Sequence, residues 1–292
     1  MLLRLPRRAN RSSPQKAGPL PPLLKWPGGK RWLADELLRT FPVEAKRYFE
    51  PFLGGAAIFF AFRPERATLS DANPELVNCY IQVRDHPERL LRALSRLRNT
   101  KANYYKVRSQ EPTDPVERAA RFLFLTTLSF NGIFRQNLHG VFNVPYGRKT
   151  HLNPADRGAI IAASKGLHGK TIICEDFEKA TELAMSGDLV YFDPPYTVAH
   201  GNNGFIKYNA KIFSWDDQVR LAKTAQRLSE RGCFVFVSNA DHESIRSLYR
   251  GFHLKVLQRH SKIAASSAFR KAITECLFFN AEVIRGTNSK HT

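Results

Sequence analysis

A short apolar run that ends in two prolines fixes one strand of this chain and the place where it stops. The run Leu189-Val190-Tyr191-Phe192 is predicted to be a buried strand. Asp193-Pro194-Pro195-Tyr196 follows directly, and two prolines cannot continue a β-ladder. Glycine and asparagine then mark a loop at 201–204. A carboxylate, a rigid turn and an aromatic ring are therefore expected at the carboxyl end of a strand, where open α/β sheets bind ligands.

The residue types of this turn suit a flat heterocycle that carries an exocyclic amino group. The Asp193 carboxylate and a backbone carbonyl can both accept hydrogen bonds from an NH₂ group, and Pro195 supplies no competing N–H. The Tyr196 ring can stack on the heterocycle, for about 1–3 kcal/mol per base. The turn therefore predicts a pocket for an amino-bearing nucleobase taken out of its stack. The simpler alternative is a strand followed by a proline turn, with Asp193 as a capping residue.

Apolar, strand-like runs alternate with helical patterns along most of the chain, which predicts an α/β fold. The seven expected strands are 48–52, 67–70, 171–174, 189–192, 233–238, 254–257 and 275–279. A helical insert interrupts the alternation at 78–167, with clear helical patterns at 90–97 and 116–128. A polar segment rich in Gly and Asn follows these helices, at 130–149.

Charge is the strongest compositional signal. The chain has 292 residues and a formal net charge of +19, from 45 Lys and Arg against 26 Asp and Glu. This excess predicts a polyanionic partner, with nucleic acid as the first candidate and a membrane surface as the second. No apolar run approaches the roughly 18 residues that cross a bilayer. The arginines and prolines of 1–22 predict a disordered basic tail rather than a signal peptide.

The cysteines predict neither a disulfide framework nor a zinc site. Cys79, Cys174, Cys233 and Cys276 lie far apart and form no C-x-x-C pair. We expect free, buried thiols in a reducing cytoplasm, and no metal.

Two glycine-bearing turns lie early in the chain. One is Pro27-Gly28-Gly29-Lys30, and the other, Leu53-Gly54-Gly55-Ala56, leads from the first strand into a helical stretch. A small-residue turn between a strand and a helix lets a ligand approach the backbone closely. Asp71 ends the second strand, and Asn73 and Pro74 are typical of a helix start.

These blocks, in this order, resemble the Dam-type DNA adenine-N6 methyltransferases, the alpha group or D12 class of enzymes that use S-adenosylmethionine. The resemblance runs from about residue 23 to 279. It rests on Leu24-Lys25-Trp26-Pro27-Gly28-Gly29-Lys30, Glu50-Pro51-Phe52-Leu53-Gly54-Gly55, Ser70-Asp71-Ala72-Asn73, Phe142-Asn143-Val144-Pro145-Tyr146-Gly147 and Asp193-Pro194-Pro195-Tyr196. The stretch 263–275, which contains Arg270-Lys271, is also similar to the family.

The resemblance implies a Rossmann-like, S-adenosylmethionine-dependent methyltransferase fold. Its sheet would be mixed, with about seven strands, and would carry an inserted, mainly helical target-recognition domain at 78–167. The catalytic domain would comprise 23–77 and 168–282, followed by a C-terminal tail at 283–292.

The resemblance also implies which residues act. Asp193 and the Pro194 carbonyl would accept hydrogen bonds from the target amine, and Tyr196 would stack on the flipped adenine. The implied cofactor residues are Trp26, Lys30, Glu50, Phe52, Gly54, Asp71 and Asp193. Of these, Lys30 is expected at the cofactor carboxylate and Asp71 at the ribose hydroxyls. The alternatives are core packing for Trp26, a solvated charge for Lys30 and helix capping for Asp71.

One departure from the family concerns the cofactor turn. The family usually has Phe-x-Gly-x-Gly, whereas Ala56 stands here in place of the last glycine. A methyl group at this position is expected to tighten the turn.

The DNA contacts implied by the resemblance lie mostly in the insert. They are Lys25, Phe130, Asn131, Arg135, Pro145 and Arg148. Arg135 matches a position that contacts a guanine, and a guanidinium suits its O6 and N7. Phe130 matches an aromatic that wedges into the duplex. The alternatives are a core role for Phe130 and a phosphate contact for Arg135, while His139 and Tyr146 are expected to be structural.

The leading hypothesis is therefore a site-specific DNA adenine-N6 methyltransferase, with GATC as the expected target. One alternative keeps the chemistry but acts on RNA or on cytosine N4; another is a catalytically silent DNA-binding scaffold. The expected partner is double-stranded DNA, with no membrane and no metal, and a cognate restriction endonuclease is a candidate. A monomer in the cytoplasm would suffice, because one active site modifies one strand at a time.

Overall fold

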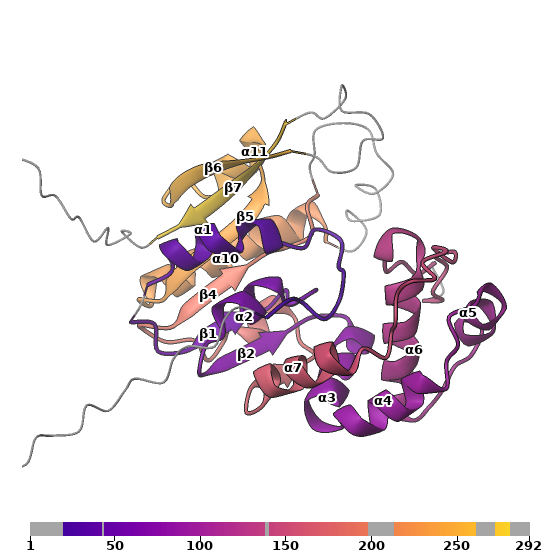
Figure 1. Cartoon of the computed structure of the whole chain (residues 1–292). Coiled ribbons are helices and arrows are strands. Elements are labelled where there is room, and N and C mark those ends of the chain that lie inside the picture. The colour runs from indigo at the N-terminus through magenta and orange to yellow at the C-terminus, as the bar shows by residue number, and fades with distance from the viewer. Residues whose placement is uncertain (1–19, 43, 138–139, 198–212, 261–271, 281–292) are drawn as a thin grey trace, which may run out of the picture.

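The computed structural model describes residues 20–42, 44–137, 140–197, 213–260 and 272–280. Within them, seven strands form one sheet in the order β3-β2-β1-β4-β5-β7-β6 (Figure 1). The strands are β1 (Tyr48–Glu50), β2 (Ala67–Ser70), β3 (Thr171–Ile173), β4 (Leu189–Phe192), β5 (Phe234–Ala240), β6 (His253–His260) and β7 (Ala272–Phe279). The seven predicted strands are confirmed. β1 ends before its predicted limit, at Glu50, because Pro51 offers no N–H to the ladder.

The sheet is parallel on one side and antiparallel on the other. β1 pairs in parallel with β2 and β4, β2 with β3, and β4 with β5. β7 runs antiparallel to both β5 and β6. The predicted fold class, a Rossmann-like α/β fold with a mixed seven-stranded sheet, is confirmed. Because parallel strands end at one edge, the segments after Glu50, Ser70 and Phe192 are brought together there.

The strands β1, β4, β5 and β7 alternate between two hydrophobic clusters, one on each face of the sheet. Tyr191 and Phe236 belong to the first cluster, whereas their neighbours Phe192 and Val237 belong to the second. Helices α1 (Ala34–Thr40) and α2 (Ala57–Phe62) pack on the first face. Helices α8 (Phe177–Ala180), α10 (Trp215–Glu230) and α11 (Glu243–Leu248) pack on the second. Consecutive residues along a strand therefore place their side chains on opposite faces of the sheet.

A group of helices between β2 and β3 stands beside the sheet (Figure 1). They are α3 (Pro74–Asp85), α4 (Pro87–Ser95), α5 (Lys101–Arg108), α6 (Pro115–Leu128) and α7 (Arg157–Leu167). Their core is continuous with the first face of the sheet. The proposed boundary at residue 78 lies inside α3, and the division into two domains stays a prediction.

The chain already contacts this core at Leu20, whose N–H donates to the Phe60 carbonyl at 3.1 Å. The greater part of the predicted basic tail, the predicted loop at 201–204, Arg270-Lys271 and the tail at 283–292 lie outside the described residues. Among the helices that the structure describes, none is long and apolar enough to cross a membrane.

The four cysteines are free, and Cys79, Cys233 and Cys276 are buried as predicted. The predicted burial of Cys174 is wrong: it is exposed, because it follows the last residue of the short strand β3. In the described part of the chain, no group of three or more His, Cys, Asp or Glu side chains could hold a metal ion.

Candidate active site

Carboxylates in β1, in β7 and directly after β4 share one face of the sheet with a buried lysine. Asp193, Glu50 and Glu275 each lie two residues from a strand residue of the first cluster, so they reach the same face. The Lys30 Nζ atom lies 2.9 Å from Asp193 Oδ1 and 3.5 Å from Glu275 Oε2. It also donates to the Gly28 carbonyl at 3.1 Å. Lys30 is only 3% exposed, so the alternative of a solvated charge is wrong.

The Tyr196 ring completes this cluster. The Lys30 Nζ atom lies 4.5 Å from the centroid of the ring, which is a cation–π contact. The Tyr196 hydroxyl donates to Glu275 Oε2 at 2.8 Å. The site therefore surrounds one cationic nitrogen with the Asp193 carboxylate, the Glu275 carboxylate and an aromatic face. Glu275 was not predicted as a site residue, because nothing in its local sequence distinguishes it from other strand positions.

Burial controls the protonation of Asp193. It raises the pKa of the carboxyl from 3.8 to about 6, although the charge of Lys30 and a hydrogen bond from Ser238 lower it. The negative charge of Glu275 acts in the same direction as burial. Asp193 is thus ionised at neutral pH and titrates close to it.

Glu50 lies deeper on the same face and reaches the start of α2. The Tyr48 hydroxyl donates to Glu50 Oε2 at 2.9 Å, and the Phe59 N–H also donates to this carboxyl. Helix α2 has no side-chain cap of its own, so Glu50 satisfies an N–H of its first turn. Burial raises the pKa of Glu50 to about 8, and the Tyr48 hydrogen bond opposes this shift.

The glycines of the turn after β1 make room for Trp26. A Cβ atom on Gly54 would lie 2.8 Å from Trp26 Cδ1, and one on Gly55 would lie 3.1 Å from Trp26 Cβ. Trp26 also stacks on Phe134 of the insert, with 5.5 Å between ring centroids. Its core-packing role is therefore real, and its predicted cofactor role stays a prediction. Ala56 adopts φ 54° and ψ 30°, a left-handed conformation that favours glycine.

Asp71 links this turn to the next loop. Its carboxylate accepts from the Gly54 N–H at 3.0 Å and from the Asn73 N–H at 2.9 Å. Asn73, rather than Asp71, caps α3, since its side chain accepts from the N–H groups of Glu75 and Leu76. Burial raises the pKa of Asp71, and these backbone hydrogen bonds oppose the shift.

A cavity of about 130 Å³ opens at the same sheet edge, next to Asp71. Aromatic rings and carboxylates line it: Phe52, Phe177 and Phe213, with Glu175, Asp176 and Asp217. Phe52 stacks on Phe177, with 5.5 Å between centroids. Of these lining residues, Phe52 is a predicted cofactor residue, whereas Asp176 and Phe177 are not among the predicted site residues. Their position directly after a predicted strand could have indicated them, because the parallel strands end at this edge.

The six residues predicted to contact DNA are all exposed: Lys25, Phe130, Asn131, Arg135, Pro145 and Arg148. Phe130 is 54% exposed, so the alternative of a core role for it is wrong. Its N–H donates to the Pro145 carbonyl at 2.9 Å, which joins two of the predicted segments. The Lys25 side chain lies against Gly132, where a Cβ atom would be 2.9 Å from Lys25 Cδ.

Two tyrosines hold the segment 142–147 in place: Tyr104 of α5, which is buried, and Tyr146, which is half-buried. The Tyr104 hydroxyl donates to the Val144 carbonyl at 3.0 Å, and the Tyr146 hydroxyl donates to Asn99 Oδ1 at 2.7 Å. The Arg135 Nε–H donates to Asn143 Oδ1 at 2.8 Å, which orients its exposed guanidinium. His139 lies outside the described residues.

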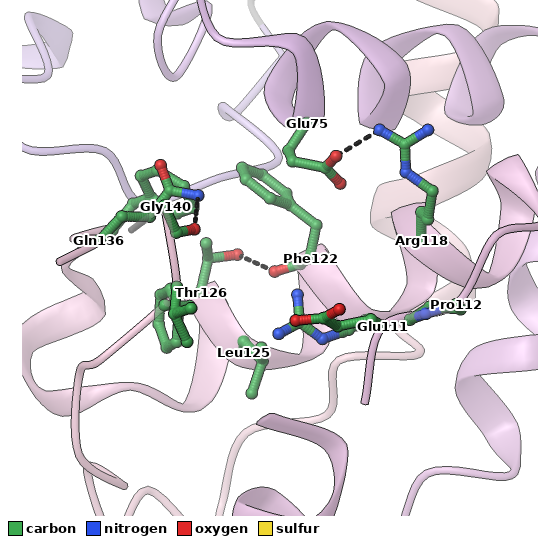
Figure 2. Close-up of a pocket in the computed structure, with 13 residues that line it drawn as sticks. Glu75, Glu111, Pro112, Arg118, Phe122, Leu125, Thr126, Gln136 and Gly140 are labelled. Carbon is green, nitrogen blue, oxygen red and sulfur yellow. Dashed lines mark hydrogen bonds and ion pairs between the residues drawn. The ribbon is translucent and has the colours of Figure 1, made fainter. Parts of the chain in front are cut away.

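A second cavity, of about 210 Å³, lies at the insert (Figure 2), and Asp193 is not among the residues that line it. Helices α3 and α6 and the segments 134–136 and 140–142 form its walls, together with Glu111 and Pro112. Figure 2 shows the ion pair between Glu75 and Arg118 and the hydrogen bond from Thr126 to the Phe122 carbonyl at its edge. Arg121 donates to the carbonyls of Val107 and Arg108, so its guanidinium is already engaged.

The strand order, the antiparallel β7 and the glycine turn after β1 together define a class I methyltransferase fold. The chain belongs to the D12 class of N6 adenine-specific DNA methyltransferases, whose family model matches residues 26–263. The predicted family and enzyme class are thereby confirmed.

Named relatives cover nearly the whole chain. The chain is 38% identical to the Type II methyltransferase M1.LlaDCHI of Lactococcus lactis subsp. cremoris, over 89% of this chain and 95% of that protein. It is 35% identical to the Type II methyltransferase M.MjaIII of Methanocaldococcus jannaschii, over 89% and 98%. It is 33% identical to a DNA adenine methylase of Vibrio cholerae, over 87% and 94%.

Proposed function

We propose that this protein transfers a methyl group from S-adenosylmethionine to N6 of an adenine flipped out of duplex DNA. One observation carries the proposal: Asp193 Oδ1 and the Tyr196 ring meet around the Lys30 ammonium. The target N6 becomes cationic as it is methylated, so a site that already stabilises a cationic nitrogen suits the transition state of this reaction.

The residues around the glycine turn fit the cofactor. Trp26 packs so closely on Gly54 that this position has no room for a side chain, and the turn therefore presents its backbone there. Asp71 offers a carboxylate beside the turn. The cavity lined by Phe52, Phe177 and Asp176 has the apolar faces and acceptors that an adenine ring requires. Lys30 is the candidate for the cofactor carboxylate, and Glu50 for its ammonium group. When bound, S-adenosylmethionine supplies a methyl group already activated on a sulfonium.

The remaining chemistry belongs to side chains and one carbonyl of this chain. Asp193 and the Pro194 carbonyl accept hydrogen bonds from the target NH₂, which orients its lone pair toward the methyl group. The bond from N6 to the methyl carbon would form as the methyl group leaves the sulfonium, and the methylated N6 would lose its proton to solvent. Tyr196 stacks on the flipped adenine. The Lys30 ammonium lies 2.9 Å from Asp193 Oδ1, and we propose that it leaves this carboxylate when the amine binds.

DNA recognition is assigned to the exposed residues of the insert. Phe130 would enter the duplex as the adenine leaves, and Arg135 would read a guanine. Asn131, Pro145, Arg148 and Lys25 would contact the same target. GATC is the proposed recognition sequence, on the family resemblance of these positions. Type II methyltransferases among the relatives make a restriction endonuclease a candidate partner, and the protein is proposed to act as a cytoplasmic monomer.

The test is methyl transfer from labelled S-adenosylmethionine to unmethylated genomic DNA, followed by mapping of the modified bases. We expect N6-methyladenine in GATC alone, and no transfer by Asp193→Asn. Methylation at another sequence would overturn the target assignment but keep the site. DNA binding without transfer would support the silent-scaffold alternative.

A further inference from the structure

The turn that carries the proposed chemistry cannot hold itself in place. Its last ladder contact with β5 is at Phe192, which pairs with Val237. Pro194 and Pro195 have no N–H groups, so neither can donate a backbone hydrogen bond that would fix the turn. The position of Asp193 and Tyr196 must therefore be set by groups outside the turn.

Gln218 of α10 supplies one such group. Its side-chain Nε2 donates to the Pro195 carbonyl at 3.2 Å. Its Oε1 accepts from Asn239 Nδ2 at 2.9 Å. Asn239 Oδ1 in turn accepts from the Ala240 N–H at 2.8 Å, which ties the relay to the backbone of β5. Gln218 and Asn239 are both fully buried, where an unpaired amide would be costly.

Ser238, the residue before Asn239, acts on the opposite face of the sheet. Its hydroxyl lies 2.5 Å from the Tyr191 hydroxyl and gives a hydrogen bond to Asp193. Consecutive strand residues point to opposite faces, so Ser238 reaches the catalytic carboxylate while Asn239 reaches α10. Two consecutive residues of β5 thus fix the turn: Ser238 through Asp193, and Asn239 through Gln218 and the Pro195 carbonyl.

We infer that Gln218 and Asn239 are positioning residues for methyl transfer, an inference that rests on the proposed function. Their relay occupies the Pro195 carbonyl with a fixed donor. Among the described residues none donates to the Pro194 carbonyl, which is left for the target amine. The relay thereby decides which of the two proline carbonyls faces the substrate. It also sets the position of that carbonyl relative to the sheet.

The experiment compares Gln218→Met with Gln226→Met on the same helix. Gln226 is exposed and donates to Glu230, so its variant is a matched control. Single-turnover methyl transfer is measured in a preformed complex of enzyme, S-adenosylmethionine and GATC DNA. We expect Gln218→Met to slow transfer about 10- to 100-fold, because small displacements of a reacting group have effects of this size. Dissociation constants for cofactor and DNA should stay within about twofold of the wild type, since neither Gln218 nor Gln226 is proposed to contact the cofactor or the DNA.

Gln218→Glu tests whether the effect comes from the lost hydrogen bond to Pro195 or from altered packing of the side chain. Burial raises the pKa of a carboxyl, so this variant is measured at high pH, where the group is ionised. The carboxylate then keeps the acceptor for Asn239 but has no donor for Pro195, so transfer should slow as much as in Gln218→Met. Asn239→Leu should also slow transfer, yet add little in the Gln218→Met background, because the two residues act in series.

Three results would overturn the inference. They are full transfer rates in both Gln218 variants, weaker binding with an unchanged rate, or fully additive effects of Gln218→Met and Asn239→Leu. The proposed function fails separately: in that case wild-type protein and Gln226→Met also transfer no methyl group.

Discussion

The Lys30 ammonium forms a buried ion pair with Asp193, at 2.9 Å, directly over the Tyr196 ring. The cation thus lies where the proposed reaction needs the target amine. Lys30 is also the residue proposed to bind the cofactor carboxylate. Cofactor binding would therefore draw the Lys30 ammonium away from Asp193. This relationship predicts that S-adenosylmethionine strengthens binding of the flipped adenine.

The ion pair also predicts the pH dependence of methyl transfer. Asp193 has a pKa of about 6, raised by burial, and its ionised form is the hydrogen-bond acceptor. The kcat/KM for DNA reports the pKa values of the free enzyme, so it should fall as the pH drops through about 6, where the carboxyl becomes protonated. Lys30 lowers this pKa, so Lys30→Met should move the midpoint to higher pH as well as weaken cofactor binding. Lys255→Met, which breaks an exposed ion pair with Glu36, is the control. An unchanged midpoint in Lys30→Met would contradict the pairing.

Glu50 should couple cofactor binding to proton release. Its folded pKa of about 8 lies above the usual 4.5, so ionisation is unfavourable in the fold, and stability falls as the pH rises between these values. A bound ammonium group would favour the ionised form. Calorimetry in two buffers at pH 7 should show release of part of a proton on cofactor binding. Glu50→Gln should abolish the release, bind cofactor more weakly and melt higher than the wild type above pH 8.

Gly54 of the glycine turn should tolerate no side chain. Gly54→Ala would place a Cβ atom 2.8 Å from the Trp26 ring at a residue with φ +46°. We expect a loss of about 1–3 kcal/mol from this overpacking, measured by urea unfolding, together with weaker cofactor binding. Gly169→Ala is the control, because it has φ +72° but no atom within 4 Å of the new Cβ. It should lose only the backbone strain, about 1 kcal/mol. Equal losses in the two variants would show that Trp26 moves aside freely.

Two exposed arginines of the insert should have different effects on DNA. Arg135→Ala should relax sequence discrimination at one base pair by about 1–3 kcal/mol, because a bidentate guanine contact is lost. Arg148→Ala should weaken binding to all sequences alike and reduce the salt slope by about one. Methylation rates on GATC and on each singly substituted site, at two salt concentrations, would check both. If Arg135→Ala behaves like Arg148→Ala, then Arg135 contacts phosphate only.

Much of the fold was readable from local pattern. The apolar runs, the prolines after Phe192 and the glycine turn after β1 depend on short-range sterics and on the period of hydrophobic residues, which a linear sequence displays directly. The predicted burial of Cys174 is wrong for a related reason: an apolar run marks a strand, but it does not show how soon the strand reaches solvent.

The ordered blocks of sequence, from Trp26 to Tyr196, determined the family and the type of chemistry, because each block is a local arrangement of backbone and side chain. Only the tertiary structure decided which side chains meet. The strand order and the parity of each strand bring Glu275 against Tyr196 and Lys30, and place Gln218 and Asn239 behind Pro195. No local pattern encodes these contacts, since they arise from packing two faces of one sheet against helices distant in the chain.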